Sequence, residues 1–148
     1  MIHRSSAVRF EQGHVALLYL CDELEHIADG LPDRIDREAC RALGMSIAET
    51  MVTAHRAEAQ WLFPALLQRA IEAPELPGVV SGLAEQHRRD QYLAEEVREA
   101  LLGFAEGKPS LSPDALGYLL RSFFDGQRRH IALERELAAP LLAGIRLH

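Results

Sequence analysis

Apolar residues recur along the chain at alternating steps of three and four positions, in four separate segments. This spacing keeps one face of an α-helix turned towards neighbouring helices. In the first segment the apolar face runs from Phe10 through Leu17 and Leu24 to Ala28. No segment contains a run of alternating apolar and polar residues, which is typical of a β-strand. The pattern therefore predicts four amphipathic helices and no sheet.

Short turn segments rich in Gly, Pro and Asp separate the helices. They cover residues 29–33, 73–78 and 107–113. Asp36 and Ser112 are typical N-cap residues and predict the starts of the second and fourth helices. We expect Pro64 to bend the second helix and Pro140 to bend or end the fourth. Because short connections favour antiparallel neighbours, we predict one all-α domain over residues 1–148, an up-down-up-down antiparallel four-helix bundle.

Composition narrows the class of protein further. The chain has 148 residues, 48% of them hydrophobic and 26% charged, which fits a single domain with a real core. Its formal net charge of -6 disfavours a nucleic-acid partner. The longest apolar run, Val15 to Cys21, is too short to span a membrane, and residues 1–13 lack an apolar signal-peptide core. We therefore expect a cytoplasmic protein without a membrane partner, in which Cys21 and Cys40 are buried small side chains.

Polar residues interrupt the apolar faces only near the middle of each helix; apart from Asp90 and Gln127 they are histidines and glutamates, and His55 flanks the face of the second helix. The six residues are His14, His55, Glu58, His87, His130 and Glu134. Glu58 follows His55 by three positions, and Glu134 follows His130 by four, so each pair lies on one helix face. Counting residues from the turns places the six at compatible heights, less closely between the second and third helices. We therefore expect the six side chains to converge on a single site.

The chemistry of this group points to a metal ion. A buried carboxylate or imidazole without a partner is costly, and a cation bound between them removes that cost. Imidazole and carboxylate ligands together favour iron, manganese or zinc, whereas an iron-sulfur or cysteine-rich zinc site would need several thiolates. The alternative for any single histidine is a hydrogen-bonded core residue. Four histidines with two glutamates at similar heights favour one shared metal site.

These residues resemble the hemerythrin-like family of HHE cation-binding domains over nearly the whole chain. The motifs that carry the resemblance are His14, residues 55–58, the Leu-Phe-Pro run at 62–64, His87 and residues 130–134. The resemblance implies a four-helix bundle with a non-haem di-iron centre, in which Glu58 and Glu134 bridge the metals and the histidines are terminal ligands. It also implies an open position for a small diatomic ligand.

Two positions depart from the family pattern. The second-helix histidine of the family would lie at position 54, which is Ala54, so His55 is displaced by one residue. The fullest pattern also has a ligand four residues after the third-helix histidine, where this chain has Gln91; Asp90 or a water molecule is the alternative ligand there. The sequence therefore leaves open a di-iron site with an exposed coordination position, a weaker site, or a single iron or other divalent metal ion.

Three functions remain open at this stage. We favour an iron-binding protein, not an enzyme, that binds or senses oxygen, redox state or iron. The second is a di-iron enzyme acting on peroxide or nitric oxide. The third is a metal-free helical interaction module whose acidic surface contacts a partner protein. A homodimer and an unknown protein partner are both compatible with the sequence.

Overall fold

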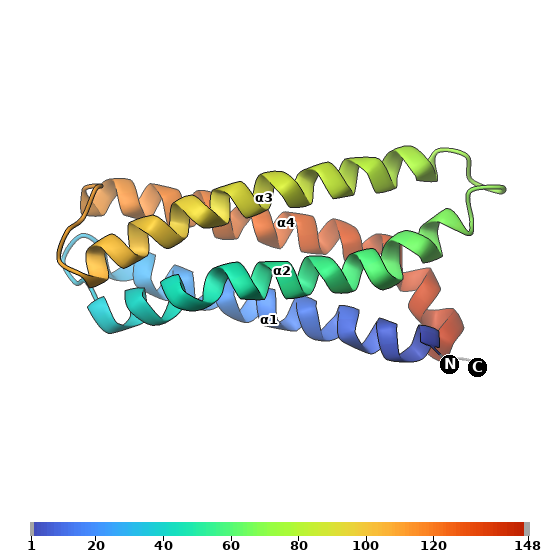
Figure 1. The fold of residues 1–148 in the computed structure, drawn as a ribbon, viewed down its shortest axis with the longest axis horizontal. Coiled ribbons are helices and arrows are strands. Elements are labelled where there is room, and N and C mark those ends of the chain that lie inside the picture. Colours follow the sequence, from blue (N-terminus) through green and yellow to red (C-terminus); the bar gives the residue numbers. More distant parts are fainter. Residues whose placement is uncertain (1, 147–148) are drawn as a thin grey trace.

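The structure is a computed structural model, and it describes residues 2–146, which form helices joined by short loops (Figure 1). The helices are α1 (Ile2–Gly30), α2 (Arg37–Leu67), α3 (Leu76–Ala105) and α4 (Pro113–Arg146). No strand occurs within this range. The all-α prediction is confirmed, while residues 1, 147 and 148 of the predicted domain lie outside the described residues.

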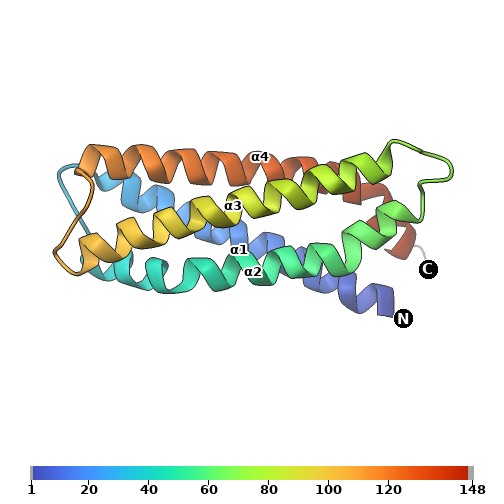
Figure 2. The same cartoon turned by 45° about the horizontal axis from the view of Figure 1, so that its top comes forward.

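The helices pack side by side as a bundle. The contacts between elements join α1 to α2, α2 to α3, α3 to α4 and α4 back to α1, so each helix has two main neighbours. The loops after α1 and after α3 lie at one end of the bundle, and the loop after α2 lies at the other (Figures 1 and 2). No described helix has a stretch apolar enough, over a sufficient length, to cross a membrane.

The helix starts follow the predicted signals with one difference. The carboxylate of Asp36 accepts a hydrogen bond from Ala39 N at 3.0 Å, and the hydroxyl of Ser112 accepts one from Ala115 N at 3.1 Å, so both N-caps are confirmed. The third helix begins earlier than predicted, at Leu76. Its first turn contains Pro77 and Gly78, and proline is tolerated there because the amide it lacks would have no intrahelical acceptor.

The two internal prolines stay within helices. Pro64 lies inside α2, which changes direction towards its C-terminal end (Figure 2). Pro140 lies inside α4, which continues to Arg146, so Pro140 does not end the helix.

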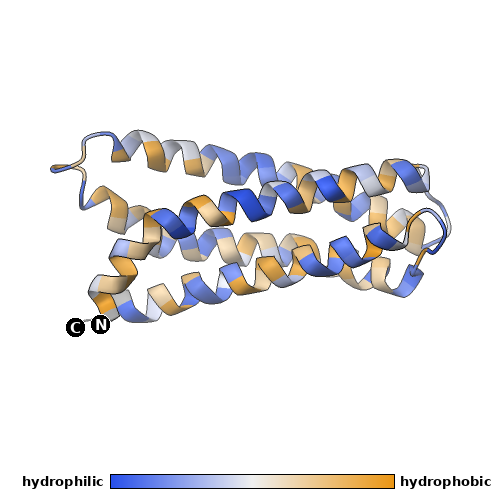
Figure 3. Ribbon diagram, turned by 180° about the vertical axis from the view of Figure 1, so that it is seen from behind, coloured by the Kyte–Doolittle hydropathy of each residue, from blue (hydrophilic) through white to orange (hydrophobic). Residues whose placement is uncertain are grey.

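Buried apolar side chains form two clusters along the bundle. Figure 3 shows apolar and polar residues alternating along each helix, as amphipathic packing requires. The larger cluster includes Leu17, Ala54, Ala94 and Ile131. The smaller cluster contains Phe10, Trp61, Leu83 and Ala138. On each helix the polar residues identified from the sequence lie between a member of one cluster and a member of the other, except His130, which precedes Ile131 of the larger cluster.

The helices α1 and α2 approach closely at the height of these polar residues. A Cβ atom placed on Gly13 would lie 3.1 Å from Ala54 Cα and 3.3 Å from Ala54 Cβ. Gly13 precedes His14, and Ala54 precedes His55. Glycine at position 13 therefore sets the distance between the two helices beside the polar site.

We expect Gly13→Ala to destabilise the protein by about 1–2 kcal/mol, because overpacking against a helix backbone outweighs the better helix propensity of alanine. Gly82→Ala is the matched control, since a Cβ atom at Gly82 meets no atom within 4 Å. This control should stabilise the protein by up to about 1 kcal/mol. Urea unfolding followed by circular dichroism measures both. Equal effects of the two substitutions would contradict the close approach.

Candidate metal centre

One polar side chain from each helix enters the space between the two apolar clusters. These side chains are His14 of α1, Glu58 of α2, His87 of α3 and Glu134 of α4, and they are buried, with exposed fractions of 1%, 1%, 7% and 3%. Members of the two apolar clusters lie before and after each of them on the same helix. The amphipathic pattern therefore places four ionisable groups in an interior from which water is largely excluded.

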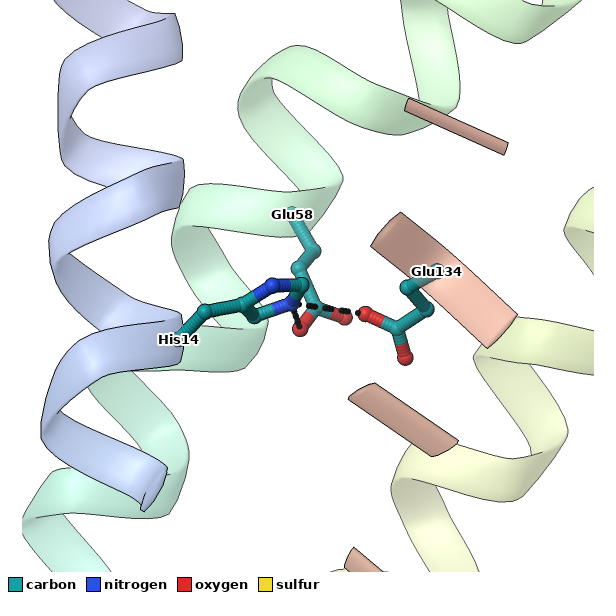
Figure 4. A group of neighbouring side chains, drawn as sticks. All are labelled: His14, Glu58 and Glu134. Carbon is teal, nitrogen blue, oxygen red and sulfur yellow. Dashed lines mark hydrogen bonds and ion pairs between the residues drawn. The ribbon is translucent and has the colours of Figure 1, made fainter. Parts of the chain in front are cut away.

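His14 faces both carboxylates (Figure 4). Its Nε2 atom lies 3.1 Å from Glu58 Oε1 and 3.1 Å from Glu134 Oε2. Ligand atoms of these three residues all lie within 4.8 Å of one another, a spacing at which they could hold one metal ion.

His87 faces the same two carboxylates through their other oxygen atoms. Its Nε2 atom pairs with Glu58 Oε2 and lies 3.3 Å from Glu134 Oε1. Each carboxylate therefore directs one oxygen to His14 and the other to His87. Two nitrogen ligands and four carboxylate oxygens are brought together from four helices.

The other two predicted ligands lie beside this group and are held by different partners. The His55 ring stacks on the His87 ring, with centroids 4.0 Å apart and an angle of 2° between the planes. Its Nδ1 atom lies 3.0 Å from Gln91 Nε2. The side chain of His130 is 28% exposed, and its Nδ1 atom lies 2.9 Å from Asp90 Oδ2. Neither residue has a hydrogen bond to Glu58 or Glu134 among the described contacts.

Several residues that the sequence analysis did not assign to the site support it. Gln86 donates a hydrogen bond from Nε2 to Asp90 Oδ1 at 3.0 Å. Phe10 packs against the His14 ring at 4.3 Å, and Phe63 against the His87 ring at 5.5 Å. The spacing of four between Phe10 and His14 is visible in the sequence, but the Phe63 contact depends on how α2 packs against α3.

The two histidines between the carboxylates favour their charged form. Burial by itself lowers the pKa of His14 and of His87, but hydrogen bonds to Glu134 and Glu58 outweigh it. The pKa of His14 is raised, and that of His87 is raised to about 9. His55 behaves in the opposite way. Burial, helped by repulsion from His87, lowers the pKa of His55 to about 3.

The carboxylates form a coupled pair whose protons are lost at different pH values. Burial raises the pKa of Glu58 more than its bonds to His14 and His87 lower it. For Glu134, burial is outweighed by the hydrogen bonds to the same two histidines, which lower its pKa. Without a metal ion, the raised pKa values of His14, His87 and Glu58 therefore favour protons at this site.

The donor set fits a metal ion better than a purely hydrogen-bonded core. The buried His14 Nδ1 atom has no hydrogen-bond partner, and Glu58 Oε2 accepts no hydrogen bond of ordinary geometry, although it pairs with His87. A cation would replace the histidine protons and be coordinated by nitrogen and oxygen atoms, which iron, manganese and zinc accept. The prediction of thiol-free coordination agrees with Cys21 and Cys40, which are buried within the larger apolar cluster.

Comparison with known protein families gives a match, which covers most of the chain. The model of the hemerythrin HHE cation binding domain matches residues 7–142, a stretch that contains every candidate ligand named above. No curated protein and no solved structure gave a significant match to the chain. The chain, with its buried carboxylates and histidines contributed by four helices, belongs to the hemerythrin HHE cation-binding domain family.

Proposed function

We propose that this protein binds iron at the centre formed by His14, Glu58, His87 and Glu134, most simply as a di-iron site. The observation that carries the proposal is the placement of each buried carboxylate between two histidines. A carboxylate with one oxygen towards each of two nitrogen ligands is suited to bridge two cations. Cation binding by the family agrees with this assignment.

His55 and His130 are the further nitrogen ligands in this proposal. The His55 ring is stacked on the His87 ring, so His55 lies on the same side of the carboxylates as His87. His130 shares a face of α4 with Glu134, four residues later. Both reach the centre only if their Nε2 atoms face it. We assign them as ligands on the side of His87, which leaves fewer nitrogen ligands on the side of His14.

The chain's own residues prepare the site for a small ligand. The apolar clusters exclude bulk water on both sides, and Phe10 and Phe63 restrict the His14 and His87 rings. Iron bound there supplies redox chemistry and a coordination position for a diatomic molecule such as oxygen. On metal binding His14 and His87 must give up their protons, because only a neutral imidazole nitrogen coordinates a metal.

A hollow beside His14 supports access for a small molecule. It has a volume of about 240 Å³ and lies between α1 and α4. Its lining residues are Phe10, Glu11, His14, Arg135, Ala139 and Leu142. A larger hollow of about 500 Å³ runs along the outer side of α1 and α2, and none of the six candidate ligands lines it. We therefore propose that the protein carries or senses oxygen, redox state or iron, with the small ligand entering on the His14 side.

The proposal includes the up-down-up-down antiparallel order of the helices. It is supported by the alternation of the connecting loops between the two ends of the bundle (Figure 1). The order in which the apolar clusters and the polar residues follow one another reverses from each helix to the next, as antiparallel neighbours require.

Iron content tests the proposal directly. Protein reconstituted aerobically with iron should hold about two iron ions per chain and show a charge-transfer absorption band. Glu58→Ala should lower iron affinity about tenfold or more, because it removes a ligand that faces both histidines. Glu49→Ala, which removes an exposed carboxylate from the same helix, is the control and should bind iron normally. Fewer than about half an iron ion per chain, without the band, would overturn the proposal.

The stability of the metal-free protein should decrease with rising pH in the neutral range. A histidine with a raised folded-state pKa contributes its full stabilisation below the unfolded value of 6.5 and loses it as the pH passes the folded value, about 9 for His87. We expect the free energy of unfolding to fall by about 2 kcal/mol between about pH 6.5 and about pH 8.5. Urea unfolding at both values measures this.

His87→Gln is the control for that measurement, because it removes the group with the largest raised pKa in this range. The decrease should then shrink to the contribution of His14. The pH range lies below the ionisation of the buried Cys21 thiol, whose pKa is raised to about 12 by burial. Equal stability of the unsubstituted protein at the two pH values would show that His87 is not paired with the carboxylates.

A further inference from the structure

Two adjacent residues of α3 contact two different histidines of the site. Asp90 Oδ2 lies 2.9 Å from Nδ1 of His130, which belongs to α4. Gln91 Nε2 lies 3.0 Å from Nδ1 of His55, which belongs to α2. In both histidines the contact is made through Nδ1, so Nε2 remains the atom that could bind a metal. The two contacts differ in charge and in hydrogen-bonding direction.

Asp90 holds His130 in one tautomer. Asp90 is 5% exposed, and both of its oxygens are occupied, because Gln86 donates to Oδ1 while His130 contacts Oδ2. A carboxylate can only accept, so Nδ1 of His130 must carry the proton and donate it. In the neutral ring Nε2 then has a free lone pair. In this arrangement both oxygens of Asp90 are engaged by side chains, one of which is the candidate ligand His130.

Gln91 does not impose the same tautomer on His55. An amide nitrogen can only donate, so in this arrangement Nδ1 of His55 accepts and the proton of the neutral ring is on Nε2. That tautomer cannot coordinate a metal through Nε2. A half-turn of the Gln91 amide group would present its oxygen instead and allow Nδ1 to donate. Gln91 is therefore compatible with both tautomers, whereas Asp90 is compatible with one.

We propose that Asp90 is a positioning residue that holds His130 ready to bind the metal through Nε2, and that Gln91 is a neutral partner that lets His55 change tautomer on metal binding. This inference rests on the proposed function. Carboxylate partners of this kind fix the orientation of a metal-bound histidine and make it a stronger ligand. Asp90 should therefore strengthen iron binding and favour the oxidised metal.

The tautomers can be measured without any metal. Long-range proton–nitrogen NMR of the ¹⁵N-histidine-labelled, metal-free full chain distinguishes a proton on Nδ1 from one on Nε2. We expect neutral His130 with its proton on Nδ1 and His55 with its proton on Nε2. In Asp90→Ala the Nδ1 tautomer of His130 should lose its preference, while His55 should be unchanged. A Nε2 proton on His130 of the unsubstituted chain would overturn the proposal, whether or not the protein binds iron.

Metal binding provides the second measurement. Competition with a chelator gives the affinity for ferrous iron, and a redox titration gives the midpoint potential. We expect Asp90→Ala to weaken binding by about 10–100-fold. The isosteric Asp90→Asn should weaken it less and raise the midpoint potential, because it removes the negative charge while keeping an acceptor. Glu96→Gln removes the same charge from an exposed position of α3 and should change neither quantity.

Gln91→Glu is the reciprocal experiment, because it replaces the neutral partner with one that only accepts. It should move the His55 proton to Nδ1, strengthen iron binding and lower the midpoint potential. Thermal unfolding of each metal-free variant checks that the bundle is intact. If the unsubstituted chain binds iron but Asp90→Asn shows an unchanged potential and Asp90→Ala an unchanged affinity, the positioning role is wrong and the proposed function stands. If the unsubstituted chain binds no iron, the proposed function fails. The NMR result then tests by itself whether Asp90 holds the proton of His130 on Nδ1.

Discussion

The burial of two carboxylates against two imidazoles is the interaction on which the rest of this structure depends. Glu58 and Glu134 are almost completely removed from water, and each would be strongly destabilising there without compensation. His14 and His87 provide it by taking one oxygen of each carboxylate. Protons balance the charge in the metal-free protein, and in the proposed function iron takes over that role. The same four ionisable side chains therefore link the stability of the fold, its dependence on pH and the binding of a metal ion.

Packing on both sides of this group explains why it can be held in place. On each helix the buried carboxylate or histidine of this group has a member of one apolar cluster before it and a member of the other cluster after it. A helix cannot slide along the bundle axis without moving its polar residue into an apolar cluster. The close approach of Gly13 to Ala54 fixes the separation of α1 and α2 at the same height. The apolar core thus sets the geometry of the ionisable groups.

The histidines divide into two kinds by their partners. His14 and His87 contact the carboxylates directly, while His55 and His130 are held through Nδ1 by residues of α3. His55, which is displaced by one residue from the family position, lies beside this group, where it stacks on His87 and contacts Gln91. Gln91, which stands where the family pattern has a ligand, contacts His55. The helix α3 thus contributes His87 and the two residues that contact His55 and His130.

The four helices, two of their caps and the candidate ligands were predictable from the sequence, because these features depend on spacing along one helix and on the chemistry of single side chains. The sequence also carried the family resemblance, through histidine and glutamate pairs at fixed separations. Which side chains meet could not be predicted, because the spacing of residues within a helix does not show how that helix is rotated against its neighbours. That rotation places Glu58 between His14 and His87, turns Asp90 towards His130, and brings Gln91 to His55.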